Sequence, residues 1–409
     1  MHVLMVICQG GWMPIHLSEG WRRLGAEVTE FFYGTTMGKN WQPTGLRENL
    51  QLNQRLWETA AKLKAEGRLD LIFAVIYDDV LMVETARKLR SLKVPLVNYH
   101  VDLVGQWYRI LRTGRFFDVV ACAQRDYWQP LQKAGITPYY MPMAANPPLQ
   151  AVADLVDHSP GATWAGVRYL GSPWLYRQEI LQQLHHHEIP LEIYGRNWQT
   201  TVKADPQTLS AAKTDQSHQY GRKNLHDLRH YALPRLQAEG IGRIWDSIRQ
   251  RLPRSGERST AKATLTSIKK IDLTPCLRGG YPQQDFWHLV TTSRINLGFT
   301  HFRGAPCTKQ EQRQVRLREF EIPMHGGFYL TQQCSELSEL FIIGKHIEAW
   351  DQWDDLIDKV RYYLEHPAVA AQIAHDGKLH CEQNHTWSKR LTNLLNFLAY
   401  PLPTTNTHS

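Results

Sequence analysis

Four charged side chains crowd into six residues of the chain, and their types suit a phosphate-bearing ligand. They are Arg316, Arg318, Glu319 and Glu321. Arginine guanidinium groups bind phosphate oxygens in a bidentate way, and a carboxylate accepts hydrogen bonds from a ribose diol. The same residues would also form ion pairs on a solvated first helical turn. The residue types therefore suggest two hypotheses, a nucleotide diphosphate site and a plain surface turn.

The sequence around these charges predicts a helix, a glycine turn and a strand. After the charged residues the chain becomes apolar over 322–324, breaks at Gly326 and Gly327, and continues as a strand-like run over 328–330. In an open α/β sheet, ligands lie beyond the carboxyl ends of the strands, where helix N-termini offer unpaired N–H groups. The charged residues are therefore predicted to lie at the ligand-binding edge of a sheet.

Strand-like and helix-like segments alternate through the first half of the chain. Strands are predicted at 3–8, 27–33, 70–77, 94–101, 117–123 and 138–143. Helices are predicted at about 15–24, 46–66, 80–92 and 125–134. Strands that alternate with helices form parallel βαβ units. Residues 1–150 are therefore predicted to form a Rossmann-like α/β domain.

Two pairs of residues in this half follow predicted strands. Gly10 and Gly11 come after the first strand, where a glycine turn lets a ligand approach the backbone closely. They are not part of a G-x-G-x-x-G motif, so a plain tight turn is the alternative. His100 and Asp102 follow the fourth strand and should emerge at the carboxyl edge of the sheet. For His100 the alternative is a structural histidine with satisfied hydrogen bonds.

Asp78 and Asp79 end the third predicted strand, at the same edge of the sheet as His100. Their carboxylates could contact a substrate, because ligands bind at this edge of open α/β sheets. They could equally cap the helix that follows, since Asp at a helix start accepts backbone N–H groups.

A second domain is predicted from about residue 165. Prolines become frequent at 138–148, and the residues that follow show no clear period, as in a domain linker. The second domain begins with a strand, a turn at Gly171 and Ser172, and a helix that carries Arg177. Arg177 is either a ligand-binding residue or a surface arginine of this helix.

Residues 203–281 carry the surplus positive charge of the chain. They hold fifteen Lys and Arg against seven Asp and Glu, and this net charge of +8 equals that of the whole chain. Helical patches and a loop-like stretch predict a partly helical, basic insertion in the second domain. Such an insertion could bind anionic lipid, a phosphorylated molecule or nucleic acid. A solvated flap is the alternative.

Composition indicates a protein of a reducing compartment. The chain has 409 residues, enough for two domains, of which 43% are hydrophobic and 21% charged. No apolar run approaches the ~20 residues that cross a bilayer. The six cysteines form no Cys-x-x-Cys pair, so neither a zinc site nor a disulfide framework is indicated. We therefore expect a cytoplasmic protein without a metal site.

The stretch RLREFEIPMHGGFYLT and the later YYLEHP and HTWSKR motifs resemble the C-terminal domain of GT-B glycosyltransferases. More narrowly, they resemble the spore-maturation-protein-like branch of the family-four-type enzymes. The segments YLGS and IYGRNW are similar to the opening of the same domain. The resemblance implies an α/β GT-B fold with two Rossmann-like domains facing each other across a cleft. These are an acceptor domain at 1–150 and a donor domain at 165–383, interrupted by the insertion at about 203–281. Residues 384–409 would form a helix that packs back on the first domain, followed by a tail.

The resemblance also implies roles for the candidate residues. Ten of them would bind the donor: Gly10, Gly11, Gly171, Ser172, Arg177, Arg316, Arg318, Glu321, Gly326 and Gly327. Glu321 aligns with the second of the paired glutamates of the family and would hold the ribose, while Arg313 stands where the first is expected. His100 would contact the sugar, and an inverting enzyme would need His100 or Asp102 as its base.

The implied activity is that of a hexosyltransferase-type glycosyltransferase. It would move a sugar from a nucleotide-diphosphate sugar to an acceptor, with retention, no metal and no other cofactor. The acceptor would be lipid-linked or anionic, with the protein in the cytoplasm or at the inner face of the membrane, and nucleic acid is not expected as a partner. The alternative is a non-catalytic GT-B-like binding or assembly protein that acts through its basic insertion.

Overall fold

The computed structural model describes residues 1–34, 45–148, 164–173, 175–198, 271–281, 285–301 and 313–403. They divide into two compact units. The described residues of unit 1 belong to Met1–Asn146 and Asn384–Ser409, and those of unit 2 to Pro147–Ser217 and Gly242–Gln383. The basic insertion predicted at 203–281 lies outside the described residues, except for its last part, 271–281.

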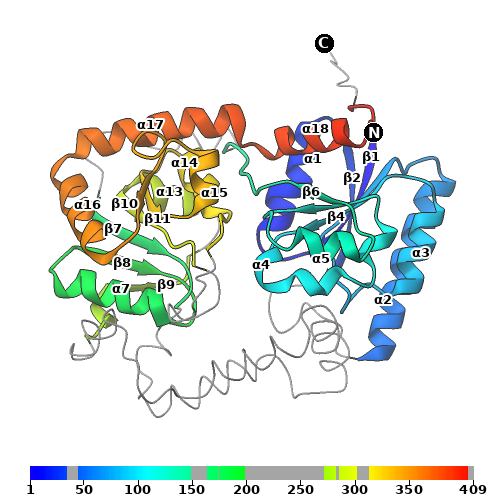
Figure 1. Cartoon of the computed structure of the whole chain (residues 1–409), viewed down its shortest axis with the longest axis horizontal. Helices are drawn as coiled ribbons and strands as arrows, with labels where there is room; N and C mark the ends of the chain where they lie inside the picture. The colour runs from blue at the N-terminus through cyan, green and yellow to red at the C-terminus, as the bar shows by residue number, and fades with distance from the viewer. Residues whose placement is uncertain are drawn as a thin grey trace. The chain divides into compact units, whose positions relative to one another are not determined.

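Unit 1 is built on a six-stranded parallel sheet with the order β2-β1-β3-β4-β5-β6 (Figure 1). The strands are β1 (His2–Cys8), β2 (Glu27–Gly34), β3 (Leu71–Ala74), β4 (Leu96–His100), β5 (Val119–Cys122) and β6 (Pro138–Tyr140). The α-helices are α1 (Glu19–Arg23), α2 (Leu46–Ala65), α3 (Val83–Ser91), α4 (Leu103–Gln106) and α5 (Trp128–Lys133). Shorter helical turns are η1 (Pro14–Ser18), η2 (Trp107–Ile110) and η3 (Gly114–Phe116).

The Rossmann-like sheet predicted for the first half of the chain is confirmed. All seven residues of β1 are buried, as expected for a central strand of a parallel sheet that helices cover on both faces. The third strand is shorter than predicted and ends at Ala74 instead of residue 77. Beyond it, the N–H of Ile76 donates to the side-chain oxygen of Asn98 at 3.1 Å, so a side chain replaces the partner that a neighbouring strand would supply.

Unit 2 is a second six-stranded parallel sheet, with the order β12-β11-β10-β7-β8-β9 (Figure 1). The strands are β7 (Trp164–Leu170), β8 (Leu191–Tyr194), β9 (Leu277–Gly279), β10 (Ser293–Leu297), β11 (Tyr329–Gln332) and β12 (Glu348–Trp350). The α-helices are α7 (Leu175–His186), α13 (Phe286–Thr291), α14 (Arg318–Met324), α15 (Ser335–Leu340), α16 (Trp353–Glu365) and α17 (Pro367–Asn384), and a short turn, η5 (Thr274–Cys276), precedes β9. The predicted second Rossmann-like half is therefore also confirmed.

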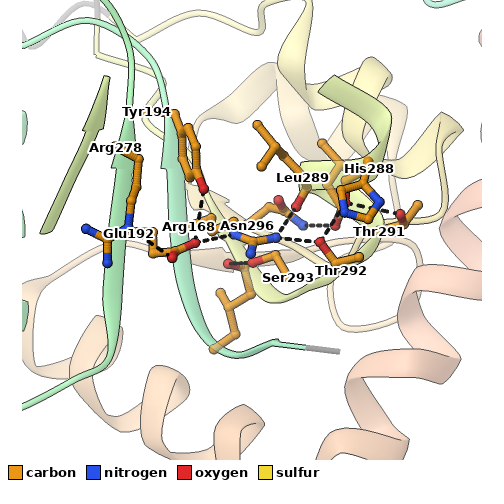
Figure 2. A network of polar contacts seen from close by, with 12 residues as sticks. Arg168, Glu192, Tyr194, Arg278, His288, Leu289, Thr291, Thr292, Ser293 and Asn296 are labelled. Atoms are coloured by element: carbon orange, nitrogen blue, oxygen red, sulfur yellow. Dashed lines mark hydrogen bonds and ion pairs between the residues drawn. The ribbon is translucent and has the colours of Figure 1, made fainter. Parts of the chain in front are cut away.

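The two faces of this second sheet have different chemistry, because side chains alternate along a strand. One face is apolar and packs against α7 and α16, with Val167, Ile193, Ile295 and Leu330 at its centre. The other face carries polar residues on three neighbouring strands: Arg168, Glu192 and Asn296. Figure 2 shows these residues joined to the end of α13 in one polar network.

Arg168 is the centre of that network. Its Nε donates to Glu192 at 2.7 Å, and its Nη1 donates to the carbonyl of Leu289 at 2.9 Å and to the hydroxyl of Thr292 at 2.6 Å (Figure 2). The positive charge thereby meets the carbonyl end of α13, where the helix dipole favours a cation. Burial acts to raise the pKa of Glu192, but the hydrogen bonds and charges of Arg168 and Arg278 hold it below its ordinary value.

The last helix, α18 (Trp387–Phe397), belongs to unit 1. Thr386 caps it by accepting the N–H of Lys389 at 3.2 Å, and the side chain of Trp387 is fully buried. A Cβ at Gly20 of α1 would lie 2.7 Å from the Cβ of Trp387, so only glycine allows α1 and α18 to approach this closely. The end of the chain thus contributes to the core of the first unit.

We expect Arg168→Met to destabilise unit 2 by about 3 kcal/mol, because it leaves a carboxylate that is only 13% exposed, and a helix end, with fewer partners. The measurement is amide hydrogen exchange along β7 and β8, which should become roughly a hundredfold faster. Arg278→Met is the matched control, because Arg278 pairs with the same carboxylate but its side chain is 41% exposed. Its effect should stay below about 1 kcal/mol. Equal effects of the two substitutions would contradict this account.

Candidate functional site

The order of strands in unit 2 reverses between β10 and β7, and this point defines where a ligand is expected. From β7 the chain proceeds outward to β8 and β9, and it then returns to β10 on the other side of β7. In open α/β sheets, ligands bind at the carboxyl edge beside such a reversal. Gly171 and Ser172 follow β7 at this edge, and Thr300 and His301 follow β10 there.

Arg177 reaches this edge from the first turns of α7. Its Nη1 donates to the phenol oxygen of Tyr169 at 2.7 Å, and its guanidinium lies 5.7 Å from the ring centre of Phe299. The phenol in turn donates to the carbonyl of Ser172 at 3.2 Å. Arg177 is therefore directed toward the sheet edge, as the ligand-binding hypothesis requires.

The charges of Arg316 and Arg318 also act on Tyr169. Burial raises the pKa of Tyr169, and the positive charges of Arg177, Arg316 and Arg318 oppose this rise. Arginines from two separate segments of the chain thus act on one phenol. Each of the three is only partly buried, so their charges are accessible at the carboxyl edge of the sheet.

Arg318 and Glu321 form an ion pair at the start of α14. The Nη1 of Arg318 donates to Oε2 of Glu321 at 2.6 Å, and its Nη2 donates to the hydroxyl of Tyr281 at 2.8 Å. The guanidinium stacks 4.2 Å from the ring centre of Phe286. The Arg318 side chain is 32% exposed, while Glu321 is buried. The buried carboxylate therefore orients an arginine that solvent or a ligand can reach.

Glu319 is the second buried carboxylate of this segment. Its Oε2 accepts the backbone N–H of Arg316 at 2.8 Å, and its Oε1 accepts the hydroxyls of Tyr329 and Thr331, both at 3.2 Å. Burial raises the pKa of Glu319. The surface-turn hypothesis for residues 316–321 is therefore wrong for both glutamates.

Gly326 and Gly327 lie at the other end of α14 from Arg318, and their role in donor binding remains a prediction. They follow the C-terminal end of α14, whereas Arg318 begins the helix. Gly326 has a φ of 80°, which only glycine adopts without strain, and its N–H donates to the carbonyl of Pro323 at 2.7 Å. A Cβ at Gly327 would lie 2.4 Å from the side chain of Val290. The two glycines turn the chain and allow close packing.

His100 of unit 1 is fully buried at the end of β4. Its Nε2 lies 3.1 Å from the carbonyl of Gln106, and its ring packs edge-on against Tyr77 at 5.0 Å. Burial, aided by the positive charge of Arg109, lowers the pKa of His100 to about 3. The imidazole is therefore neutral near pH 7, but with so low a pKa it is a weak proton acceptor, which favours a hydrogen-bonding role over that of a base.

Asp102, Gly10 and Gly11 lie beyond the carboxyl ends of β4 and β1, as predicted. Asp102 is half-buried and accepts a long hydrogen bond of 3.4 Å from the amide of Gln106. Gly11 is exposed and has a φ of 85°. The roles of these three residues in binding or catalysis remain predictions.

Asp78 and Asp79 hold the segment that follows α4 in place. Asp78 accepts the backbone N–H groups of Arg112 and Thr113 at 2.9 and 3.0 Å, and burial raises its pKa to about 6. Asp79 accepts two hydrogen bonds from Arg109 at 2.8 and 2.9 Å, and both side chains are buried. Neither carboxylate caps the next helix through its side chain.

Sequence reasoning missed three residues that shape these two sheet edges: Tyr169, Tyr281 and Arg109. They acquire their roles from partners elsewhere in the fold, and a single sequence carries no signal of such contacts. Glu319 was singled out with its charged neighbours, but its bond to the backbone was not foreseen, although a carboxylate three residues after Arg316 can accept the backbone N–H of that residue at a helix start.

Comparisons with known proteins agree with this architecture. Residues 270–396 match a protein-family model described as glycosyl transferase-like. No curated protein sequence matches the chain.

Solved structures resemble the whole chain. Sucrose-phosphate synthase from Thermosynechococcus elongatus gives a TM-score of 0.54 at 11% identity, over 98% of both chains. HepE from Anabaena, in complex with UDP-glucose, gives 0.53 at 11% identity, over 98% of this chain and 99% of the other. An alpha-glucosyltransferase in complex with UDP and a 13-mer DNA gives 0.56 at 12% identity, with the same coverage. At such identities the likeness establishes the fold.

The fold is therefore GT-B, and residues 270–396 are similar to a glycosyl transferase-like domain. Over the described ranges, no helix is both long enough and apolar enough to cross a membrane. Within the same part of the chain, no group of three or more His, Cys, Asp and Glu side chains could hold a metal ion.

The lowered pKa of His100 predicts that its ring signals in an NMR titration will not shift between pH 5 and pH 8. The folded value of about 3 lies below the ~6.5 of an unfolded chain, so the unfolded state takes up the proton first as the pH falls. The contribution of His100 to stability is therefore complete above about pH 6.5 and is lost toward pH 3. His100→Asn would assign the signals. A midpoint near 6.5 would contradict the burial argument.

Proposed function

We propose that this chain transfers a sugar, of hexose type, from a nucleotide-diphosphate sugar to an acceptor. The observation that carries the proposal is the grouping of Arg177, Arg316 and Arg318 around Tyr169, beside the reversal of strand order. Guanidinium forks match phosphate oxygens, and this edge of an α/β sheet is where ligands bind. The UDP and UDP-glucose held by structural relatives support a donor of this kind.

The three arginines would stabilise the departing diphosphate. When the bond between the sugar's anomeric carbon and the diphosphate oxygen breaks, negative charge accumulates on the diphosphate. Fixed positive groups that already point at this oxygen lower the barrier, because they need no reorganisation during the reaction. We propose that this arrangement needs no divalent metal ion and no further cofactor, and that the sugar keeps its anomeric configuration, as the family resemblance suggests.

The acceptor is proposed to be anionic or lipid-linked, with the protein in the cytoplasm or at the inner face of the membrane. The support is the net charge of +8 in residues 203–281, which equals that of the whole chain. Clustered Lys and Arg attract anionic molecules and anionic membrane surfaces over a distance of ~8 Å at physiological salt. A non-catalytic binding protein is the alternative function.

The decisive experiment is a thermal-shift screen against nucleoside diphosphates and their sugars, followed by a hydrolysis assay with the best ligand. A ligand at 100 times its dissociation constant stabilises the folded state by ~2.7 kcal/mol, which is readily detected. Turnover of a nucleotide sugar would exclude the non-catalytic alternative. Absence of both binding and turnover across the panel would refute the proposed function.

Glu321→Ala should weaken nucleotide affinity by ~1.5–3 kcal/mol, because it removes a charged hydrogen-bond acceptor and the carboxylate that orients Arg318. Calorimetry with the best nucleotide of the screen measures this. Glu365→Ala, at an exposed position on α16, is the control and should bind as the parent chain does. Unchanged affinity in a folded Glu321→Ala protein would remove Glu321 from the site.

Sugar transfer should survive chelation. The arginines supply positive charge at the leaving group, which is the role that Mg²⁺ or Mn²⁺ has in metal-dependent transferases. The assay compares initial rates with excess EDTA, with Mg²⁺ and with Mn²⁺, and we expect equal rates. Loss of activity in EDTA that either metal restores would contradict the proposed mechanism.

A further inference from the structure

We infer that Glu319 is a positioning residue that holds Arg316 where it can bind the diphosphate. The inference rests on the proposed function, because it assumes that Arg316 contacts the nucleotide. Glu319 is only 1% exposed and both of its oxygens already accept hydrogen bonds from the protein, so we place it behind the ligand-binding arginines and not in contact with the ligand. Its effect on binding would be transmitted through the backbone of Arg316.

The carboxylate of Glu319 connects the start of α14 with the end of β11. One oxygen accepts the backbone N–H of Arg316 at 2.8 Å, while the other accepts the hydroxyls of Tyr329 and Thr331 on β11. The strand is part of the rigid sheet, whereas the residues just before a helix lack helical hydrogen bonds. Glu319 therefore fixes the segment before α14 to the sheet.

Arg316 is consequently held at two points. Its backbone is fixed by Glu319, and its Nη2 donates to the carbonyl of His301 at 2.8 Å. His301 follows β10, at the reversal of strand order. A guanidinium held at both ends loses little conformational entropy when it binds phosphate, which increases affinity.

The neighbouring strand leaves space for this arrangement. A Cβ at Gly298 would lie 2.3 Å from the hydroxyl of Tyr329 and 2.4 Å from that of Thr331. Both distances are shorter than van der Waals contact allows. Because residue 298 is glycine, the two hydroxyls can occupy this space and donate to the same oxygen of Glu319.

Two substitutions distinguish a positioning role of Glu319 from an effect of its negative charge. In Glu319→Gln, the amide oxygen can still accept the N–H of Arg316, and the amide nitrogen can donate to the two hydroxyl oxygens. Glu319→Ala removes all three hydrogen bonds. If Glu319 acts by position, the glutamine variant should bind nucleotide almost as the parent chain does, and the alanine variant should not.

Unit 2 also offers a matched control for the loss of a buried carboxylate. Glu348 on β12 is 7% exposed, and it accepts the hydroxyl of Tyr363 at 2.6 Å. Its environment resembles that of Glu319, but its partners do not include the three arginines: they are Tyr363, Lys359 and the N–H of Ala349. Glu348→Ala should therefore leave nucleotide affinity unchanged.

The experiment measures, by calorimetry, the dissociation constant of the nucleoside diphosphate that the full chain binds best among UDP, GDP, ADP, CDP and TDP. We expect Glu319→Ala and Arg316→Gln each to weaken binding at least tenfold, and Glu319→Gln to stay within threefold of the parent. The double variant Glu319→Ala/Arg316→Gln should bind no more weakly than Arg316→Gln alone, because the two residues act through one contact. Thr331→Val, which removes one of the three hydrogen bonds, should give an intermediate loss and replaces Glu319→Ala if that protein does not fold.

Two results would overturn the inference while leaving the proposed function intact. One is binding by Glu319→Ala or Thr331→Val within threefold of the parent, or a loss of affinity in the control Glu348→Ala that equals the loss in Glu319→Ala. The other is additive losses in the double variant, which would show that Glu319 acts independently of Arg316. If the parent chain binds none of the five nucleotides, the proposed function itself fails, and the inference fails with it.

Discussion

The positive charges of three arginines act on one phenol, that of Tyr169, and holding these like charges in one region is the constraint on which the candidate site depends. Arg177 donates to Tyr169, Arg316 donates to a backbone carbonyl, and Arg318 pairs with a buried glutamate. The acceptors of Arg177 and Arg316 in these hydrogen bonds are neutral, whereas Arg318 donates to a carboxylate. A site of this kind has a positive potential that attracts a diphosphate, but repulsion between its own positive groups destabilises it. The buried hydrogen bonds at the start of α14 offset that repulsion.

The segment that carries two of these arginines shows how much the sequence could predict. The change from charged to apolar residues predicted a helix, a glycine turn and a strand, and the structure contains α14, a turn at Gly326 and β11. Residues two apart on a helix point in directions about 200° apart, so Glu319 and Glu321 must meet different partners. Which partners they meet depends on hydroxyls of β11 and on Arg318, and the local pattern could not reveal the hydroxyls.

The same limit applies to Gly326 and Gly327. A glycine pair in a motif can serve a ligand or the backbone, and the sequence does not distinguish the two uses. The α-helix rises 1.5 Å per residue, so the seven residues of α14 separate its two ends by about 10 Å. A glycine turn after the helix therefore lies at the opposite edge of the sheet from the arginines at its start.

His100 illustrates a different limit. Its position after a strand predicted the carboxyl edge correctly, because strand ends follow from hydrophobic pattern. Its protonation state depends on burial against Tyr77 and on the charge of Arg109, which Asp79 in turn holds in place. These contacts join residues from three segments of unit 1. Such a network lowers the pKa of the histidine to about 3, and only the folded chain contains it.

The polar face of the second sheet connects its interior with the candidate site through α13. Arg168 binds the carbonyl end of this helix, and Phe286, the first residue of the helix, lies under the guanidinium of Arg318. Because α13 has only six residues, an anchor at one end also fixes the other. The ring of Phe286 can then stack against the guanidinium of Arg318, while Tyr281 and Glu321 accept its hydrogen bonds. The Arg168–Glu192 pair, which lies on the face of the sheet and not at its ligand-binding edge, thus contributes to the placement of Arg318, which is proposed to bind the diphosphate.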